Sequence, residues 1–423
     1  MKHIIILGDG MADHKVASLG NKTLLQVADK PYMDKLAKEG RCGLLVTVPQ
    51  GYNPGSEVAN TAIMGYDLDK VYEGRGPLEA ASIGYEMTND DFAIRCNIIT
   101  LGEGRFITHN GGNLQTEDAN ELIDMLNREL GNDTVKFIAG IQYRHLLVIK
   151  NGNKHIVCAP PHDHPNEEWK PMLVKPEDGW ADKHDVYIDL EGNEHVRMTA
   201  QETADIINEL ILKSQTLLAE HPYNKAKAAA GERQANSIWP WSGGYRPSME
   251  TLMQLYPQVN TGSVISAVDL IRGIGHYAGL NIIKVDGVTG LYDTNYEGKA
   301  KAAIEALRKD DFVFVHVEAT DEAGHDGDLE LKLRTINYLD HRIIEPIYNE
   351  VSTWDEPVCI SILPDHPTPV ELRIHVNEPV PFIVWHKGIT PDSVECYDED
   401  SVKQGAYGTL VLQEYMKELM QIQ

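Results

Sequence analysis

Short apolar runs rich in β-branched residues, separated by helical stretches, constrain this chain more than any other feature. The runs most typical of strands are Ile4–Leu7, Gly43–Val48, Ile282–Val285, Phe312–Val317, Val358–Leu363 and Val380–Trp385. The clearest helical patterns between them are Pro31–Glu39, Val264–Ala278, Gly298–Arg308 and Leu329–Val351. Strands that are buried on both faces and alternate with helices predict an α/β fold, in which a mostly parallel sheet is sandwiched by helices.

The middle of the chain has a different pattern. From about Gly74 to Gly244 the chain has many polar turn segments, such as GEGRFITHNGG and PPHDHPNEEW. Two helices are predicted among them, at Thr116–Leu130 and Thr199–Ala219. We therefore expect a smaller α+β domain, residues 75–244, inserted into a parallel-sheet domain made of residues 1–74 and 245–423.

The charge and the cysteine content exclude several classes of function. With 38 basic and 64 acidic residues, the net charge is −26, which disfavours binding to nucleic acid or to an anionic membrane surface. No apolar run approaches the ~18 residues of a membrane span. The five cysteines contain no CxxC pair, so neither a disulfide framework nor a thiolate zinc site is expected. These observations favour a cytoplasmic protein.

Acidic and imidazole side chains follow three of the predicted strands. Asp9 follows the first strand, the run FVFVHVEAT leads into DEAGH, and VCISILP leads into Asp-His. The residues concerned are Asp9, Asp321, His325, Asp365, His366 and, further along, His375. The carboxyl ends of parallel strands meet at one edge of a sheet, so these side chains are expected to converge.

Such a mixture of ligands has a defined metal preference. Carboxylate and imidazole ligands suit manganese or zinc and disfavour calcium and soft metals. The set is large enough for two ions a few ångströms apart, as in phosphoryl-transfer sites. Taken singly, each Asp could instead cap a helix and each His could be a solvated surface residue.

The segment NPGSEVAN offers a nucleophile. Pro54-Gly55 predicts a tight turn, which places Ser56 at or just before the start of a helix at Glu57–Met64. Backbone N–H groups at a helix N-terminus bind phosphoryl oxygens and can support an attacking alkoxide. Serine in this position is equally typical of an ordinary N-cap, and the sequence leaves both interpretations open.

Together these segments resemble the alkaline phosphatase superfamily, and most closely the archaeal type of cofactor-independent phosphoglycerate mutases. The strings that carry the resemblance are GDGMAD, NPGSEVANTAIMGYD, EGRGPLEAASIG, EATDEAGHDGD and PDHPTPVELRIH, and the resemblance extends over nearly the whole chain. It implies two divalent ions, manganese or zinc with magnesium as a further candidate. One ion would be held by Asp321, His325 and His375. The other would be held by Asp9, Asp365, His366 and the oxygen of Ser56, the residue that is transiently phosphorylated.

The resemblance also implies a reaction, the interconversion of 3-phosphoglycerate and 2-phosphoglycerate in glycolysis and gluconeogenesis. Archaeal-type mutases carry an Asp-Arg-Arg-Ala-Gly-Arg string in the inserted domain, whereas this chain has Thr108–Gln115 there, without arginine. That feature resembles a subgroup of mutase-like proteins proposed to be homoserine kinases of threonine biosynthesis, which is the alternative function. A catalytically silent metal-binding protein is a third hypothesis, which the complete ligand set weakens.

The inserted domain is expected to bind the substrate, a small phosphorylated or hydroxylated carboxylate, in a cleft between the two domains. The residues predicted to contact it are Arg95, Arg144, His162, Asp163 and Arg233. Guanidinium groups bind such anions as bidentate forks. The alternative for each arginine is that it makes a surface ion pair with an acidic residue. The alternative for His162 and Asp163 is that they belong to an ordinary Pro-rich turn and do not bind substrate. A homo-oligomer is left open.

Overall fold

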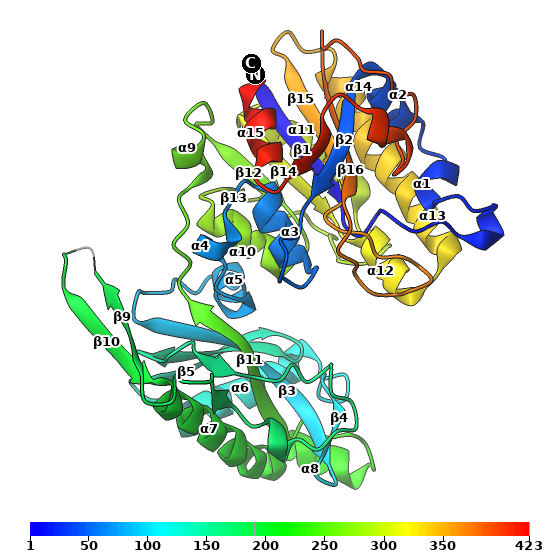
Figure 1. Ribbon diagram of the computed structural model, residues 1–423. Coiled ribbons are helices and arrows are strands. Elements are labelled where there is room, and N and C mark those ends of the chain that lie inside the picture. Colours follow the sequence, from blue (N-terminus) through cyan, green and yellow to red (C-terminus); the bar gives the residue numbers. More distant parts are fainter. Residues whose placement is uncertain (190, 423) are drawn as a thin grey trace. The chain divides into compact units, whose positions relative to one another are not determined.

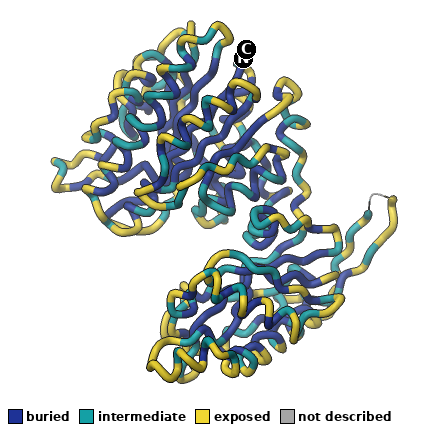
Figure 2. Tube along the Cα trace, turned by 180° about the vertical axis from the view of Figure 1, so that it is seen from behind, coloured by how far each residue is buried: buried dark blue, intermediate teal, exposed yellow. Residues whose placement is uncertain are grey.

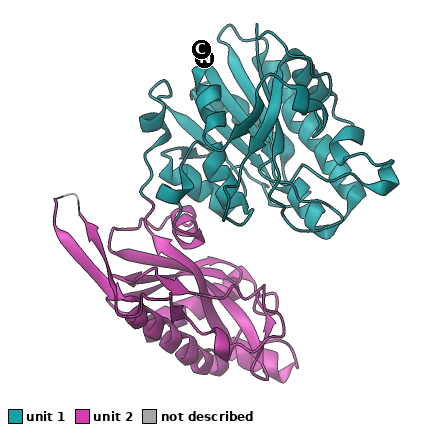
Figure 3. Cartoon of the chain, viewed as in Figure 1, with its two compact units in different colours: residues 1–72, 248–423 teal, residues 73–247 magenta. Residues whose placement is uncertain are grey.

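The computed structural model describes residues 1–189 and 191–422, which form two compact units, Met1–Tyr72 with Ser248–Gln423 and Glu73–Pro247 (Figure 3). The predicted boundaries at 75 and 244 lie two and three residues inside those of the second unit. Positions 190 and 423, which the predicted ranges include, lie outside the described residues.

The first unit is built on an eight-stranded sheet in the order β13-β12-β14-β1-β15-β16-β2-β17 (Figure 1). Only β16 runs against its neighbours, β15 and β2. The strands are β1 (Lys2–Gly8), β2 (Arg41–Val46), β12 (Gly262–Ile265), β13 (Asn281–Ile282), β14 (Phe312–Val317), β15 (Val358–Leu363), β16 (Val380–His386) and β17 (Gly408–Val411). The predicted α/β class with a mostly parallel sheet is confirmed.

Helices surround this sheet. The α-helices of the unit are α1 (Leu24–Val27), α2 (Pro31–Glu39), α3 (Ser56–Ile63), α4 (Leu68–Val71), α9 (Leu252–Leu255), α10 (Asp269–Tyr277), α11 (Tyr296–Leu307), α12 (Ala319–Asp326), α13 (Leu329–Leu339), α14 (Glu345–Val351) and α15 (Glu414–Gln421). Short 3₁₀ turns lie at Ala17–Leu19 and Ser401–Gln404, and a π-helical turn, Asp340–Ile344, joins α13 to α14.

The central strands β14, β1 and β15 are buried along their whole length, and Figure 2 shows how buried and exposed residues are distributed along the chain. All seven residues of β1 are buried. Ile4 and Ile6 pack in one core with residues of α2, α11 and α14. Ile5 and Leu7 point to the opposite face, because side chains alternate along a strand, and they are equally inaccessible. No helix in the described ranges is long and apolar enough to cross a membrane.

One predicted helix is wrong. Val264–Ala278 is not continuous: β12 (Gly262–Ile265) is a buried strand of the sheet, and α10 begins only at Asp269. Both segments are apolar and no Gly or Pro separates them, so the change of period from two to 3.6 is hidden in the sequence.

The second unit is an antiparallel sheet packed against helices. Its main sheet has the order β11-β3-β6-β5, with β4 paired to β3. The strands are β3 (Asp91–Gly102), β4 (Arg105–Thr108), β5 (Val135–Ile141), β6 (Arg144–Lys150), β7 (Ile156–Val157), β8 (Lys175–Pro176), β9 (His184–Ile188), β10 (Glu194–Thr199) and β11 (Ser237–Tyr245). The helices are α5 (Arg75–Ser82), α6 (Thr116–Leu130), α7 (Ala200–Glu220) and α8 (Pro222–Ala229), with a 3₁₀ turn at Lys170–Met172.

Candidate active site

The predicted ligands converge at the carboxyl ends of three adjacent strands, β14, β1 and β15. Asp9 follows β1, and its backbone N–H donates to the carbonyl of Val317 at the end of β14 (2.9 Å). Asp365 follows β15, and one of its oxygens accepts from the N–H of Gly10 (3.1 Å). Asp321 lies in the first turn of α12, directly after β14. The parallel register of the three strands therefore aligns three carboxylates from distant parts of the sequence.

A glycine makes this close approach feasible. Gly10 has a φ of +60°, and a Cβ there would lie 2.8 Å from the Cα of Asp321 and would overlap the Asp321 carboxylate. The turn after β1 thus needs glycine for its conformation and for space.

Asp321 and two imidazoles form the first group of ligand atoms. Asp321 lies 3.2 Å from Nε2 of His325 and 3.4 Å from Nε2 of His375. The two Nε2 atoms are 2.9 Å apart. Each ring has its Nδ1 at a backbone carbonyl, that of Arg373 for His325 (3.0 Å) and that of Pro54 for His375 (2.6 Å). With Nδ1–H donated to a carbonyl, both Nε2 lone pairs point at the carboxylate, an arrangement that suits a cation.

Asp9, Asp365 and His366 form the second group, next to Ser56. Their ligand atoms all lie within 4.8 Å of one another. Ser56 Oγ is 3.2 Å from His366 Nε2 and 3.3 Å from Asp9 Oδ2. Asn60 in α3 donates from its side chain to Asp365 (3.0 Å) and to the carbonyl of Ser56 (2.8 Å), so it fixes both relative to the helix.

Ser56 is the first residue of α3, and its N-cap is Gly55. No side-chain capping bond is made at this end, so the interpretation of Ser56 as an ordinary N-cap is not supported. The hydroxyl instead points at the Asp9–His366 pair, at the positive end of the helix dipole.

Thr368 links the two groups. Its hydroxyl donates to Oδ1 of Asp321 and lies 3.3 Å from Nδ1 of His366. The His366 and His375 rings are stacked with centroids 3.8 Å apart. Three further residues of the site, Asn60, His316 and Glu318, were not predicted either. Their only sequence signal is that they lie inside the quoted strings NPGSEVAN and FVFVHVEAT, and burial and orientation cannot be deduced from such strings.

The electrostatics of the site favour bound cations. Burial, together with Asp365 and Glu318, raises the pKa of Asp9 well above its usual value. Burial would also raise the pKa of Asp321, but hydrogen bonds from His325 and His375 hold it well below its usual value. The same carboxylate raises the pKa of His325 to about 9. Asp9 has no exposed surface, and its Oδ1 accepts no hydrogen bond from the described residues. Buried carboxylates this close need counter-charge, so the residues fit divalent ions.

The residues predicted to bind the substrate lie in the second unit, and three of them belong to one basic–aromatic cluster. The Arg95 guanidinium lies 4.8 Å from the Trp241 ring centre, and the His162 ring lies 5.0 Å from it. His109, which was not predicted, is 6.1 Å from His162 and 5.7 Å from Tyr143, and Arg144 lies over Tyr143 (5.8 Å).

The members of this cluster differ in how they are paired. Arg95 is buried and donates to Glu79 (3.0 Å) and Asn97 (3.1 Å), so it makes an ion pair, but a buried one and not the surface pair of the alternative. Arg144 is half-buried, and its Nε has no partner in the described residues. Asp163 lies beside His162 at 3.5 Å and is mostly exposed. Arg233 is exposed, and none of the described ring or ion-pair contacts joins it to the cluster.

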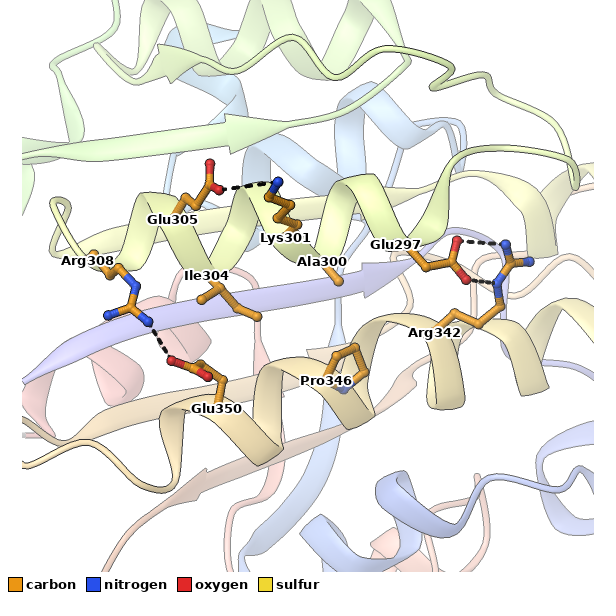
Figure 4. Close-up of a pocket in the computed structure, with 9 residues that line it drawn as sticks. All are labelled: Glu297, Ala300, Lys301, Ile304, Glu305, Arg308, Arg342, Pro346 and Glu350. Atoms are coloured by element: carbon orange, nitrogen blue, oxygen red, sulfur yellow. Dashed lines mark hydrogen bonds and ion pairs between the residues drawn. The ribbon is translucent and has the colours of Figure 1, made fainter.

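A separate hollow of about 350 Å³ lies between α11 and the segment made of the π-helical turn and α14 (Figure 4). Its charged lining is internally paired, Arg342 with Glu297, Arg308 with Glu350 and Lys301 with Glu305. None of its lining residues belongs to the ligand groups, so we do not take it as the reaction site.

Comparison with known proteins agrees with this geometry. The family model of 2,3-bisphosphoglycerate-independent phosphoglycerate mutase matches residues 37–224. Curated proteins with that name are 45% identical in Methanosarcina mazei, with 96% of each chain covered, and 45% identical in Methanothermobacter thermautotrophicus, with 99% and 97% covered. A probable mutase of Geobacter sulfurreducens is 42% identical, with 95% of each covered.

Two solved structures share the fold. A protein from Pyrococcus horikoshii superposes with a TM-score of 0.80 at 27% identity, with 99% of this chain and 97% of that one covered. A cofactor-independent phosphoglycerate mutase from Thermoplasma acidophilum gives 0.67 at 23% identity with both chains fully covered, and at that identity it supports the fold alone.

Proposed function

The chain belongs to the family of 2,3-bisphosphoglycerate-independent phosphoglycerate mutases, and we propose that it interconverts 3-phosphoglycerate and 2-phosphoglycerate through a phosphoserine at Ser56. The observation that carries the proposal is the position of the Ser56 hydroxyl. It lies 3.2 Å from His366 and 3.3 Å from Asp9, at the first residue of α3. The homoserine kinase alternative gains no support, because the near relatives carry the mutase name over almost the whole chain.

Two divalent ions, manganese or zinc with magnesium as a further candidate, complete the site in this proposal. Asp321, His325 and His375 would hold one of them. Asp9, Asp365, His366 and the Ser56 oxygen would hold the other. Bound there, the ions supply charge that lowers the pKa of the serine hydroxyl and neutralises the phosphoryl oxygens.

The chain's own residues perform the transfer in two halves. Ser56 Oγ loses its proton and attacks phosphorus in line, so the Oγ–P bond forms while the bond to the substrate oxygen breaks and that oxygen takes up a proton. The glycerate hydroxyl next to it then attacks the phosphoserine, and Ser56 regains its proton. Ser56 is the first residue of α3, so the positive end of the helix dipole would favour the phosphoryl group on its oxygen.

The glycerate end of the substrate needs positive charge, because the protein carries a net charge of −26. We propose that the basic–aromatic cluster of the second unit supplies it, with Arg144 as the residue most able to do so. Its Nε–H donates to no partner among the described residues, whereas Arg95 is already paired with Glu79. His162 adds a neutral donor, since burial and the nearby Arg75 lower its pKa while Asp163 opposes the shift.

The compartment we propose is the cytoplasm. All five cysteines are free thiols, and burial raises the pKa of Cys158 to about 12, which disfavours its oxidation.

A direct assay tests the proposal. Protein reconstituted with manganese is given 3-phosphoglycerate alone, without bisphosphoglycerate or nucleotide, and phosphorus NMR follows the products. We expect 2-phosphoglycerate to accumulate to equilibrium. If 3-phosphoglycerate stays unchanged while homoserine consumes a nucleoside triphosphate, the proposed function is wrong.

A further inference from the structure

Asn97 is a buried residue of the basic–aromatic cluster to which the proposed transfer gives no role. It lies in β3 and is only 1% exposed. Its Oδ1 accepts from Nε of Arg95 (3.1 Å) and from Nε1 of Trp241 (3.3 Å). Its Nδ2 donates to the carbonyl of His109 (3.3 Å). One amide therefore holds two donors of the cluster and the backbone that carries one of its imidazoles.

The strand pairing explains why these side chains meet. Side chains alternate along a strand, so Arg95 and Asn97 point to the same face of β3. In the neighbouring strands, Trp241 of β11 pairs with Arg95, and Arg144 of β6 pairs with Asn97. Paired residues of an antiparallel sheet present their side chains on one face, a few ångströms apart. Asn97 is thus the neighbour of both arginines of the cluster.

The contacts of Arg95 fix the plane of its guanidinium. Nε donates to Asn97, Nη1 donates to Glu79 (3.0 Å), and the group lies 4.8 Å from the centre of the Trp241 ring. A guanidinium has five N–H groups in one rigid plane, and Nη2 takes part in neither of these hydrogen bonds. Holding the Nε edge therefore sets the direction in which the remaining N–H groups point.

We propose that Asn97 is a positioning residue for substrate binding, which fixes Arg95 and Trp241 so that the remaining N–H groups of Arg95, alongside Arg144, meet the substrate carboxylate. The inference rests on the proposed function, because it takes the basic–aromatic cluster as the site of the glycerate anion. Asn97 acts through other side chains, since its Oδ1 already accepts two hydrogen bonds. Planar, fixed guanidinium groups bind carboxylates best.

The competing explanation is that Asn97 only stabilises the second unit. Asn224 in α8 is a matched control, because it is also 1% exposed and its side chain also makes three hydrogen bonds. Its Nδ2 donates to the carbonyls of Leu218 and Ala235, and its Oδ1 accepts from the N–H of Ala235. None of these partners belongs to the cluster. A purely structural role predicts the same consequences for the loss of either asparagine.

The experiment compares the full-length wild type with Asn97→Ala and Asn224→Ala, all loaded with manganese. Conversion of 3-phosphoglycerate and the melting temperature are measured for each. We expect both variants to melt at a lower temperature than the wild type. Only Asn97→Ala should raise the KM, by about tenfold, with a kcat close to that of the wild type, because it weakens binding and not the chemical step.

A double-mutant cycle shows whether Asn97 acts through Arg95. Once the guanidinium is removed in Arg95→Met, the further loss of Asn97 should change the KM little, so the two effects should not multiply. A crystal structure of the wild type with bound 3-phosphoglycerate does not depend on the folding of any variant. It should show the substrate carboxylate at Arg95 while the hydrogen bond between Arg95 and Asn97 persists.

The outcomes distinguish this inference from the proposed function. An unchanged KM in Asn97→Ala, an equal rise in Asn224→Ala, effects that multiply in the cycle, or a carboxylate bound away from Arg95 would each overturn the positioning role. The wild type would still convert 3-phosphoglycerate in all four cases. A wild type that does not convert 3-phosphoglycerate would contradict the proposed function, and the inference about Asn97 with it.

Discussion

At the scale of single residues, the proposed chemistry depends most on Ser56. Ser56→Ala removes the hydroxyl but leaves Asp9, Asp365 and His366, whose ligand atoms lie within 4.8 Å of one another without it. We expect turnover to fall by at least about a thousandfold, since loss of a covalent nucleophile removes the reaction path itself. Mutase rate and manganese content are measured together, with Ser352→Ala as a control outside the ligand groups. A Ser56→Ala enzyme that keeps even a tenth of the rate would contradict the role of Ser56.

A second prediction at this scale follows from the raised pKa of His325. Asp321 raises it from 6.5 to about 9, so in the metal-free fold His325 is protonated at neutral pH and loses this proton when an ion binds. Manganese affinity at this site should therefore rise about tenfold per pH unit from 6.5 towards 9. Calorimetry in buffers of different ionisation enthalpy measures both the affinity and the released proton. Affinity that does not change over this range would disprove the coupling.

The same shift affects the stability of the metal-free protein with a defined sign. A folded-state pKa above the unfolded one stabilises the fold fully below pH 6.5, and this contribution is lost as the pH rises through 9. Metal-loaded protein should not show this loss, because the ion replaces the proton. Denaturant unfolding of both forms between these two pH values provides the comparison.

Much of the candidate site could be predicted at the residue scale because its ligands follow predicted strands. Asp9, Asp321 and Asp365 each follow an apolar run that is predicted to be a strand. Parallel topology places the carboxyl ends of these strands together. His316 could not be found in this way, since it lies inside a buried strand where a structural interpretation is the default. Thr368 and Asn60 act through hydrogen bonds to other ligands, and no sequence pattern reports such contacts.

At the scale of elements, a buried lysine holds the loops of the site together. Lys332 in α13 donates to Asp13 (2.8 Å), to the carbonyl of Thr368 (2.8 Å) and to that of Ala12 (3.3 Å), and neither Lys332 nor Asp13 has an exposed side chain. It thus connects the turn after β1 with the segment that follows Asp365.

Lys332→Met would leave the Asp13 carboxylate buried without its partner. We expect the free energy of unfolding to fall by about 3–5 kcal/mol, the usual cost of breaking a buried pair. Lys301→Met is the control. Lys301 is exposed and pairs with Glu305 at 3.9 Å, and exposed ion pairs contribute about 0–1 kcal/mol to stability. Denaturant titration measures both variants. If the Lys332→Met and Lys301→Met variants had the same free energy of unfolding, Lys332 would not stabilise these loops.

Element boundaries were predictable where caps or breakers mark them. The helix predicted at Thr116–Leu130 agrees with α6, which ends at Leu130 with Gly131 as its C-cap, and Pro31 begins α2 as expected of proline in the first turn. The single helix predicted over 264–278 was wrong because a buried strand is followed there by a buried helix, with no cap or breaker residue between them to mark the boundary. Short apolar runs do not distinguish these two structures.

At the scale of the whole molecule, the two groups of candidate metal ligands lie in the first unit and the basic–aromatic cluster lies in the second. If the cluster binds the glycerate anion, Arg144→Met should raise the KM for 3-phosphoglycerate at least about tenfold, because it removes a charge-assisted hydrogen bond. The melting temperature should change little, since Arg144 is half-buried and makes no described ion pair. Arg105→Met is the control, as Arg105 is exposed and 3.8 Å from Glu168. An unchanged KM would remove Arg144 from substrate binding.

The fold class was predictable at this scale because the period of the apolar residues changes between the ends and the middle of the chain. The composition of the basic–aromatic cluster was not, because side chains such as His109 and Tyr143 meet only after folding. Self-association stays a prediction.

The central claim is that the phosphoryl group passes through Ser56, and trapping that intermediate tests it most directly. Manganese-loaded protein is mixed with 3-phosphoglycerate, quenched in acid within milliseconds, digested and analysed by mass spectrometry. We predict one phosphoryl group on the peptide that contains Ser56, formed without nucleotide and absent from Ser56→Ala. A protein that converts 3-phosphoglycerate to 2-phosphoglycerate at full rate while Ser56 stays unmodified at every quench time would contradict the account.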